Sequence, residues 1–146
     1  MVSSPVKSEW DKVSFASTLF LCPILDNLLL TVPSKWYAEI RLGLQEALVN
    51  AAKHGNNLDP QKQVIVRFCF EEGAYWWIIS DEGGGFRPPA RHVRENSILP
   101  PVESESGRGM FLLNQIFDRV VWNRQGTEIC LCKQLSDQTD REPLLH

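Results

Sequence analysis

The chain has 146 residues, of which 43% are hydrophobic and 23% charged, and its formal net charge is −3 at pH 7. This composition is typical of one compact globular domain with a hydrophobic core. The slightly acidic balance argues against binding through a broad basic surface, so we expect no direct nucleic-acid partner. The longest apolar stretch, residues 19–32, is interrupted by Pro23, Asp26 and Asn27, so we expect no membrane span.

The cysteines Cys22, Cys69, Cys130 and Cys132 form no CxxC pair, and no histidine stands at metal-ligand spacing from them. We therefore expect four reduced, mostly buried thiols. Such thiols are typical of a reducing cytoplasm. The N-terminus has no basic flank followed by an apolar run, and no secretory signal is predicted. These features together predict a cytoplasmic protein.

The first half of the chain predicts one strand and two helices. Residues 12–19 alternate weakly, as in a strand, and residues 21–30 form a short apolar helix. A long helix is predicted at 35–54, where Ser34 is a natural N-cap and Gly55 a C′ residue.

The second half adds strands and one helix. Strands are predicted at 64–70, 75–80, 119–122 and 127–135, with a helix at 109–118 and a Gly- and Pro-rich stretch at 83–107. The pattern predicts an α+β fold, a two-layer α/β sandwich of helices against one mixed sheet. The domain is expected at 11–135, between a flexible leader at 1–10 and a polar tail at 136–146.

The long helix carries polar side chains at a spacing that suits metal or base chemistry. Its apolar residues recur at three- and four-residue steps, and Glu39, Glu46, Asn50 and Lys53 fall largely elsewhere on the helix. Glu46 and Asn50 are four residues apart and therefore share a face. They can hold Mg²⁺ together with its waters, or Glu46 alone can act as a general base. A solvated helix face is the alternative interpretation.

Two glycine-rich segments predict contacts with a nucleotide. Asp81 follows a strand, where its carboxylate can accept from an exocyclic amine such as that of adenine, and the glycines of 83–85 let a base lie on the backbone. The segment 107–110 precedes a helix, whose N-terminus attracts anions, and Arg108 adds a positive charge. Thr127 can reach a phosphate. Ordinary tight loops are the alternative, and neither a P-loop nor a dinucleotide fingerprint is present.

Four motifs follow one another along the chain: Glu46-Ala-Leu-Val-Asn50-Ala-Ala-Lys-His54-Gly55, Asp81-x-Gly83-x-Gly85-Phe86, Gly107-Arg108-Gly109-Met110 and Gly126-Thr127. In this order they resemble the GHKL (histidine-kinase-like) ATPase superfamily, over about 34–135. The short chain looks most like its stand-alone anti-sigma-factor serine/threonine kinases. The resemblance implies a Bergerat-type fold, whose mostly antiparallel sheet is covered on one face by helices.

The resemblance also implies ATP and Mg²⁺ as cofactors and a role for each matching residue. Glu46 would be the catalytic base that activates a serine hydroxyl, Asn50 would ligate Mg²⁺, and Asp81 would bind the adenine amine. The remaining ATP-binding residues would be His54, Gly83, Gly85, Phe86, Gly107, Arg108, Gly109, Met110 and Thr127. Residues 87–106 would form a mobile lid over the nucleotide.

The resemblance implies protein partners as well: a STAS-domain anti-sigma antagonist as substrate, and a sigma factor that the protein would sequester. Kinases of this group often carry an arginine on the first helix, but here no basic residue lies between Lys12 and Lys35. Lys35, Arg41 or Arg91 would have to replace it. A non-catalytic ATP-gated switch and a detached histidine-kinase ATP domain are the alternatives.

The apolar segment 20–30 and the aromatic residues Trp10, Trp36 and Tyr37 would build a homodimer or partner surface, with core packing as the alternative.

Overall fold

The computed structural model describes residues 10–84, 105–135 and 144. Its elements in chain order are β1 (Asp11–Ala16), α1 (Cys22–Leu28), α2 (Ser34–Val49), a π-helical turn η1 (Asn50–Gly55), β2 (Gln63–Glu71), β3 (Ala74–Ser80), α4 (Glu105–Ile116), β4 (Arg119–Trp122) and β5 (Glu128–Gln134). The leader 1–9, the tail except residue 144, and the lid up to 104 lie outside the described residues, so the predicted domain limits stay a prediction.

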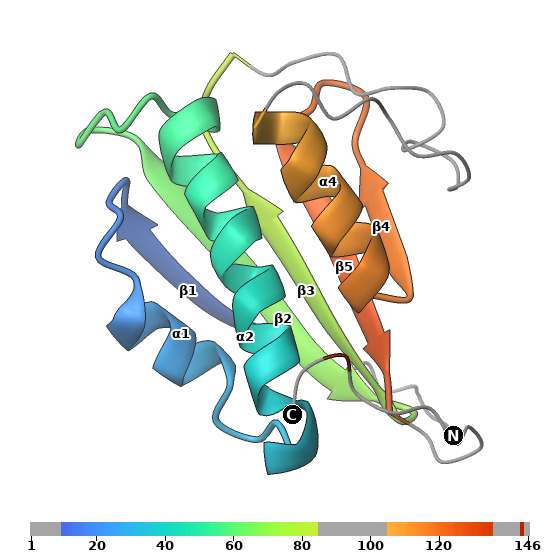
Figure 1. The fold of residues 1–146 in the computed structure, drawn as a ribbon. Helices are drawn as coiled ribbons and strands as arrows, with labels where there is room; N and C mark the ends of the chain where they lie inside the picture. The colour runs from blue at the N-terminus through green and yellow to red at the C-terminus, as the bar shows by residue number, and fades with distance from the viewer. Residues whose placement is uncertain (1–9, 85–104, 136–143, 145–146) are drawn as a thin grey trace, which may run out of the picture.

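The strands form one five-stranded sheet in the order β1-β2-β3-β5-β4. All four ladders within the described residues are antiparallel. The helices α1, α2 and α4 lie together on one face of the sheet (Figure 1). The α+β two-layer fold is therefore confirmed, with a sheet whose described part contains no parallel pair.

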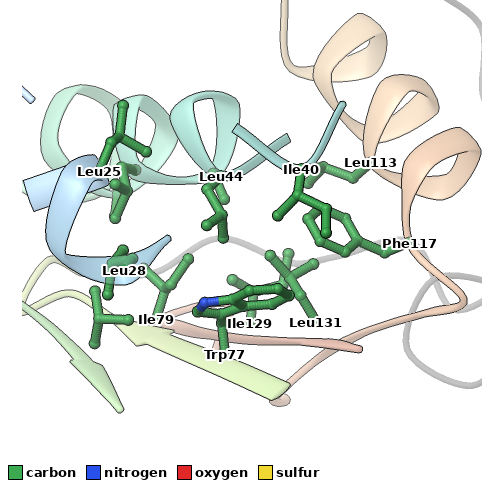
Figure 2. Close-up of a cluster of buried hydrophobic side chains, with 14 of the residues drawn as sticks. Leu25, Leu28, Ile40, Leu44, Trp77, Ile79, Leu113, Phe117, Ile129 and Leu131 are labelled. Carbon is green, nitrogen blue, oxygen red and sulfur yellow. The ribbon is translucent and has the colours of Figure 1, made fainter. Parts of the chain in front are cut away.

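Alternation along the strands explains why the helices cover one face. In β3, Trp77 and Ile79 are buried, whereas Trp76 and Ile78 on the other face are partly exposed. The register sets Trp77 opposite Leu131 and carries this buried row across the sheet. The helices add apolar side chains to the same core, which Figure 2 shows above the sheet: Leu25, Leu28, Ile40, Leu44, Leu113 and Phe117.

A glycine sets how closely α2 and α4 approach. A methyl group at Gly43 of α2 would lie 2.5 Å from the ring of Phe117, just after α4. Only a residue without a side chain fits this contact. The contact brings α4 beside α2, and the sheet edge that carries β4 and β5 lies behind it (Figure 1).

Most element boundaries differ from the sequence prediction by one to four residues, and three of the differences concern α2, α4 and β1. The helix α2 begins at Ser34, with Pro33 at the N-cap position and no side-chain cap, and it continues as the π-helical turn η1. The helix α4 begins at Glu105 rather than at 109, so its glycines lie within the first turns instead of before them. The strand β1 ends at Ala16 rather than at 19. Local patterns fix helix and strand ends only within a few residues.

The polar position predicted for Glu39 is wrong. Its side chain is only 2% exposed, and its Oε2 accepts a hydrogen bond of 2.9 Å from the equally buried Nζ of Lys133. This ammonium also donates to the Ile116 carbonyl at 2.7 Å and lies 4.5 Å from the centre of the Trp36 ring. The other Glu39 oxygen accepts from the Leu144 backbone N–H. Glu39 faces the sheet because Lys133, on its inward face, supplies the compensating charge.

The apolar segment 20–30 divides between core and surface. Leu25 and Leu28 of α1 are buried, whereas Phe20 is 71% and Leu30 77% exposed. Trp10 is also exposed at 41%. Core packing therefore accounts for the inward half of α1 only. No helix among the described residues is long and apolar enough to cross a bilayer.

All four cysteines are free. Cys69 and Cys132 are buried and Cys130 is half-buried, as expected for most of the thiols, but Cys22 is exposed. Burial raises the pKa of Cys69 and of Cys132 to about 11, with a further rise from nearby acidic residues. These two thiols are therefore poor nucleophiles at neutral pH.

Candidate nucleotide-binding site

The predicted pair Glu46 and Asn50 lies against the first turns of α4. Glu46 is in the last turn of α2, and Asn50 begins η1. A methyl group at Gly109 would lie 2.7 Å from Glu46 Oε2 and 3.4 Å from Asn50 Nδ2. The fold thus brings two of the four sequence motifs into contact. The absence of a side chain at 109 is what leaves room for the two polar groups.

The end of the same helix contacts a third motif. After Asn50 the chain winds as a π-helical turn to Gly55, where a Cβ atom would overlap the carboxyl group of Asp81. A Cβ atom at Gly83 would in turn overlap the Gly55 carbonyl. No pattern of residues in the chain predicts the π-helical turn. Such turns are rare and often occur at functional sites.

Asp81 follows β3 and is held on both sides. Its backbone N–H donates to the Thr127 carbonyl at 2.9 Å, and its Oδ1 accepts from the Gly83 N–H at 2.9 Å. Burial raises the pKa of the Asp81 carboxyl above its ordinary value, against smaller opposing effects of the Gly83 N–H and of Lys62. A half-buried, oriented carboxylate is suited to accept from one well-placed donor of a ligand.

These groups border a pocket with apolar walls. It is lined by Ala47, Asn50, Ala51, His54, Gly55, Ile79, Asp81, Met110, Trp122, Gly126 and Ile129. Apolar walls with a few convergent polar groups are typical of sites for small molecules. The four predicted motifs therefore meet at a single pocket, between the helices and the inward face of the sheet.

Sequence reasoning missed the residues that form the apolar walls. Ile79, Trp122 and Ile129 are inward-facing strand residues, and Trp122 is paired with Ile129 in the ladder between β4 and β5. Each looked like an ordinary core residue. Ile79 could have been recognised from the sequence, because it stands two residues before Asp81 and residues two apart in an extended chain face the same side. The other two required the strand order.

The remaining predicted site residues are placed less completely. Gly107 and Arg108 belong to the first turn of α4, but the structure describes neither the Arg108 side chain nor Gly85 and Phe86. The hydroxyl of Thr127 accepts from Asn123 at 3.0 Å. The Thr127 carbonyl accepts from the Asp81 N–H, so Thr127 lies beside Asp81.

The described residues contain no cluster of three or more His, Cys, Asp or Glu side chains that could hold a metal ion. Mg²⁺ usually needs only one or two carboxylate or amide ligands beside phosphate oxygens and water. Glu46 and Asn50 carry such carboxylate and amide oxygens, and both side chains lie beside Gly109, where the nearest Asn50 atom is Nδ2. The residue types fit Mg²⁺, with the Asn50 oxygen turned toward the ion.

The chain belongs to the histidine kinase-like ATPase domain family, whose sequence profile matches residues 23–133. The match includes every described element except β1 and the end of β5, and it confirms the superfamily predicted from the four motifs. An ATPase domain implies that the protein binds ATP.

Within this family the chain is similar to bacterial regulators. It is 30% identical over 102 residues to the anti-sigma F factor of Geobacillus kaustophilus. The aligned region covers 67% of this chain and 69% of that protein. It is 27% identical over 105 residues to the serine-protein kinase RsbW of Bacillus subtilis. This aligned region covers 68% of this chain and 66% of that protein. The chain thus spans about two thirds of the length of these relatives.

Proposed function

We propose that the protein is an ATP-dependent serine/threonine kinase of the anti-sigma-factor type. The observation that carries the proposal is that Asn50, which lies beside Glu46 and Gly109, lines the same pocket as Asp81. A base beside the pocket and a purine-binding carboxylate within it suit a nucleotide. The similarity to an anti-sigma F factor and to a serine-protein kinase supports the same choice.

In this proposal the adenine lies between the apolar walls, with its amine on Asp81. The desolvated walls favour a flat base, and the carboxylate selects a ligand with a donor at that edge. Thr127 adjoins Asp81, which favours a role for it at the base rather than at the phosphates. The N-terminal turns of α4, with Gly107, Arg108 and Gly109, would then face the phosphates, because free N–H groups at a helix start attract anions.

Glu46 would accept the proton of the incoming hydroxyl as the general base. Phosphoryl transfer needs mainly positioning and charge stabilisation, so one oriented base beside the phosphates is sufficient for this step. Asn50, with Glu46 beside it, would hold Mg²⁺, which when bound would neutralise phosphate charge. The remaining predicted ATP-binding residues, His54, Gly83, Gly85, Phe86 and Met110, and the lid at 87–106 belong to the same proposal.

The protein partners follow from the relatives' names and from the predicted branch. We propose a STAS-domain antagonist as the phosphorylated substrate and a sigma factor as the sequestered partner. The exposed apolar side chains of Leu19, Phe20 and Leu30 provide surface for a protein partner or for a second copy of the chain. A cytoplasmic location, which the free thiols favour, belongs to the same proposal.

Transfer of labelled phosphate tests the kinase. The purified protein is incubated with γ-labelled ATP and a STAS-domain protein from the same organism, beside the variants Glu46→Gln and Gln45→Ala. Gln45 is the exposed neighbour and serves as the control. We expect acid-stable label on the partner with the wild type and Gln45→Ala, and at least a hundredfold slower labelling with Glu46→Gln, which still binds ATP. Undiminished transfer by Glu46→Gln would exclude the role of this residue.

A specific observation favours the second candidate, a non-catalytic switch that holds a partner when ATP is bound. Lys35 stands eleven residues before Glu46, about 16 Å along the helix, and its Nζ lies over the Trp36 ring at 5.6 Å. The Arg41 guanidinium is directed to Gln45 and to the Cys22 thiol. Neither side chain is recorded in contact with Glu46 or with the pocket, which leaves a lid arginine such as Arg91 as the predicted replacement for the family arginine.

The two candidates differ in one measurement. A switch would bind a partner more tightly with ATP than with ADP and would leave the partner without label after prolonged incubation. Label on the partner, lost in an Arg91→Ala variant, would instead support a kinase that takes its arginine from the lid.

A further inference from the structure

Asn56 is a polar residue with no exposed surface at the junction of four segments. It follows η1 directly, and its side chain is 0% exposed. Its Nδ2 donates to the Ser17 hydroxyl at 2.9 Å and to the Gln63 carbonyl at 3.0 Å. Its Oδ1 accepts from the Glu82 backbone N–H at 2.8 Å. Both amide hydrogens and the oxygen are thus engaged, which is nearly the full capacity of a carboxamide.

The three partners of Asn56 come from separate parts of the sheet. Ser17 follows β1 and is bonded twice to Lys62, through its N–H at 3.1 Å and its hydroxyl at 2.9 Å. Gln63 begins β2, and its N–H donates to Glu82 Oε1 at 2.9 Å. Asn56, Gln63 and Glu82 therefore form a closed set of hydrogen bonds. The Gln63–Glu82 bond is exposed, but the carboxamide of Asn56 at the centre of the set is buried and satisfied, and such a group orients the segments that it joins.

Asp81 lies inside this frame. The Glu82 N–H that bonds to Asn56 belongs to the residue after Asp81, and Gly55, which packs against the Asp81 carboxyl, is the residue before Asn56. The carboxyl is therefore set by the Gly55 backbone on one side and by the fixed Glu82 peptide on the other. A shift of either segment would move the acceptor that faces the pocket.

We propose that Asn56 is a positioning residue for selection of the nucleotide base. Its carboxamide joins the end of η1 to the turn after β3 and so fixes the direction of the Asp81 carboxylate. Asn56 is not among the residues that line the pocket, so it would act on the base only through Asp81. The proposal rests on the proposed ATP site, in which Asp81 accepts from the adenine amine.

Base discrimination separates this role from a purely structural one. ATP and inosine triphosphate differ at the purine 6-position, where the second carries an oxygen instead of the amine. The ratio of their dissociation constants therefore reports the Asp81 contact, whereas a general loss of stability weakens both alike. The ratio is measured by calorimetry for the wild type, for Asn56→Ala, and for Ser17→Ala, which removes one partner of Asn56 but keeps the bond to Glu82.

We expect the wild type and Ser17→Ala to prefer ATP over inosine triphosphate to a similar degree. In Asn56→Ala the preference should fall about tenfold, the effect of one misdirected hydrogen bond to a charged group. A folded Asn56→Ala that keeps the full preference overturns the role of Asn56. A wild type that binds ATP without any preference overturns the assignment of Asp81 itself, and with it the proposed site.

A measurement on the wild type keeps the proposal testable if Asn56→Ala does not fold. The Glu82 amide hydrogen, bonded to Asn56, should exchange slowly with solvent in the nucleotide-free protein. Exchange as fast as that of the exposed neighbour Gly84 would show that the turn is not held, and would overturn the proposal.

Discussion

Gly109 of α4 faces Glu46 of α2 so closely that a methyl group at 109 would lie 2.7 Å from the Glu46 Oε2 atom. Real Cβ atoms do not approach an oxygen to this distance, so a side chain at 109 would displace the Glu46 carboxylate, the end of a flexible side chain, from its place beside Asn50. The contact joins two motifs that are 63 residues apart in the sequence, 46 to 109. It also makes the site sensitive to a single added carbon atom.

Gly109→Ala is therefore expected to weaken ATP binding about tenfold, since overpacking typically costs about 1–3 kcal/mol. The control is Gln115→Ala, which changes an exposed side chain of the same helix that does not line the pocket. Calorimetric titration with ATP compares both variants with the wild type. Equal affinity in all three would show that α4 adapts without cost and that the contact does not shape the site.

Asp81→Asn should make the protein more stable at neutral pH. Burial raises the pKa of Asp81 in the folded state, so its favourable contribution is present below the unfolded value of 3.8 and is lost as the pH rises through the folded pKa. The stability advantage of the variant should grow with pH above 3.8 and then level off. Urea unfolding at several pH values measures it.

The control for this series is Asp26→Asn, which removes an exposed carboxylate of α1. It reports the general effect of one lost negative charge. An advantage of Asp81→Asn that shrinks as the pH rises would mean that the folded protein lowers the pKa of Asp81. The carboxylate would then be stabilised by a partner rather than desolvated at the edge of the pocket.

Lys133→Met should destabilise the fold by about 3 kcal/mol, because it leaves the Glu39 carboxylate buried without its partner. The double variant Glu39→Met, Lys133→Met should regain most of this loss, since two well-packed apolar side chains often replace a buried ion pair. Arg67→Ala is the control. Its pair with Glu128 is 3.5 Å long and its side chains are 45% and 38% exposed, so about 1 kcal/mol or less is expected.

Urea unfolding of the four proteins gives the comparison. A double variant as unstable as Lys133→Met would indicate that the two charged side chains stabilise the fold through other contacts as well as by neutralising each other. In that case the bonds of Lys133 to the Ile116 carbonyl and of Glu39 to the Leu144 N–H would be the next contacts to examine.

The sequence predicted the order and type of most elements, because each is long enough for its helical or strand periodicity to be recognised. The strands β2 and β3 alternate between buried and more exposed residues over most of their length. The pair Glu46 and Asn50 meets at Gly109, as their spacing on one helical face indicates. The meeting of the four motifs at one pocket was predicted only through the family resemblance. Spacing along a chain does not fix which strand lies beside which.

Three features depend on tertiary contacts and could not be predicted. Glu39 looks polar on a helical wheel, and only the strand order reveals that Lys133 lies opposite it. The π-helical turn after Asn50 requires the packing of Gly55 on Asp81. The apolar walls of the pocket depend on the pairing of β4 with β5, which places Trp122 beside Ile129.

In the proposed function the pocket binds ATP through Asp81. Calorimetric titration of ATP into the wild type and into Asp81→Ala measures this contact. We predict one ATP per chain for the wild type and at least tenfold weaker binding for Asp81→Ala, because a hydrogen bond to a charged acceptor is lost. Absence of ATP binding by the folded wild type would exclude an ATP site, and equal affinity of the two proteins would exclude the role of Asp81.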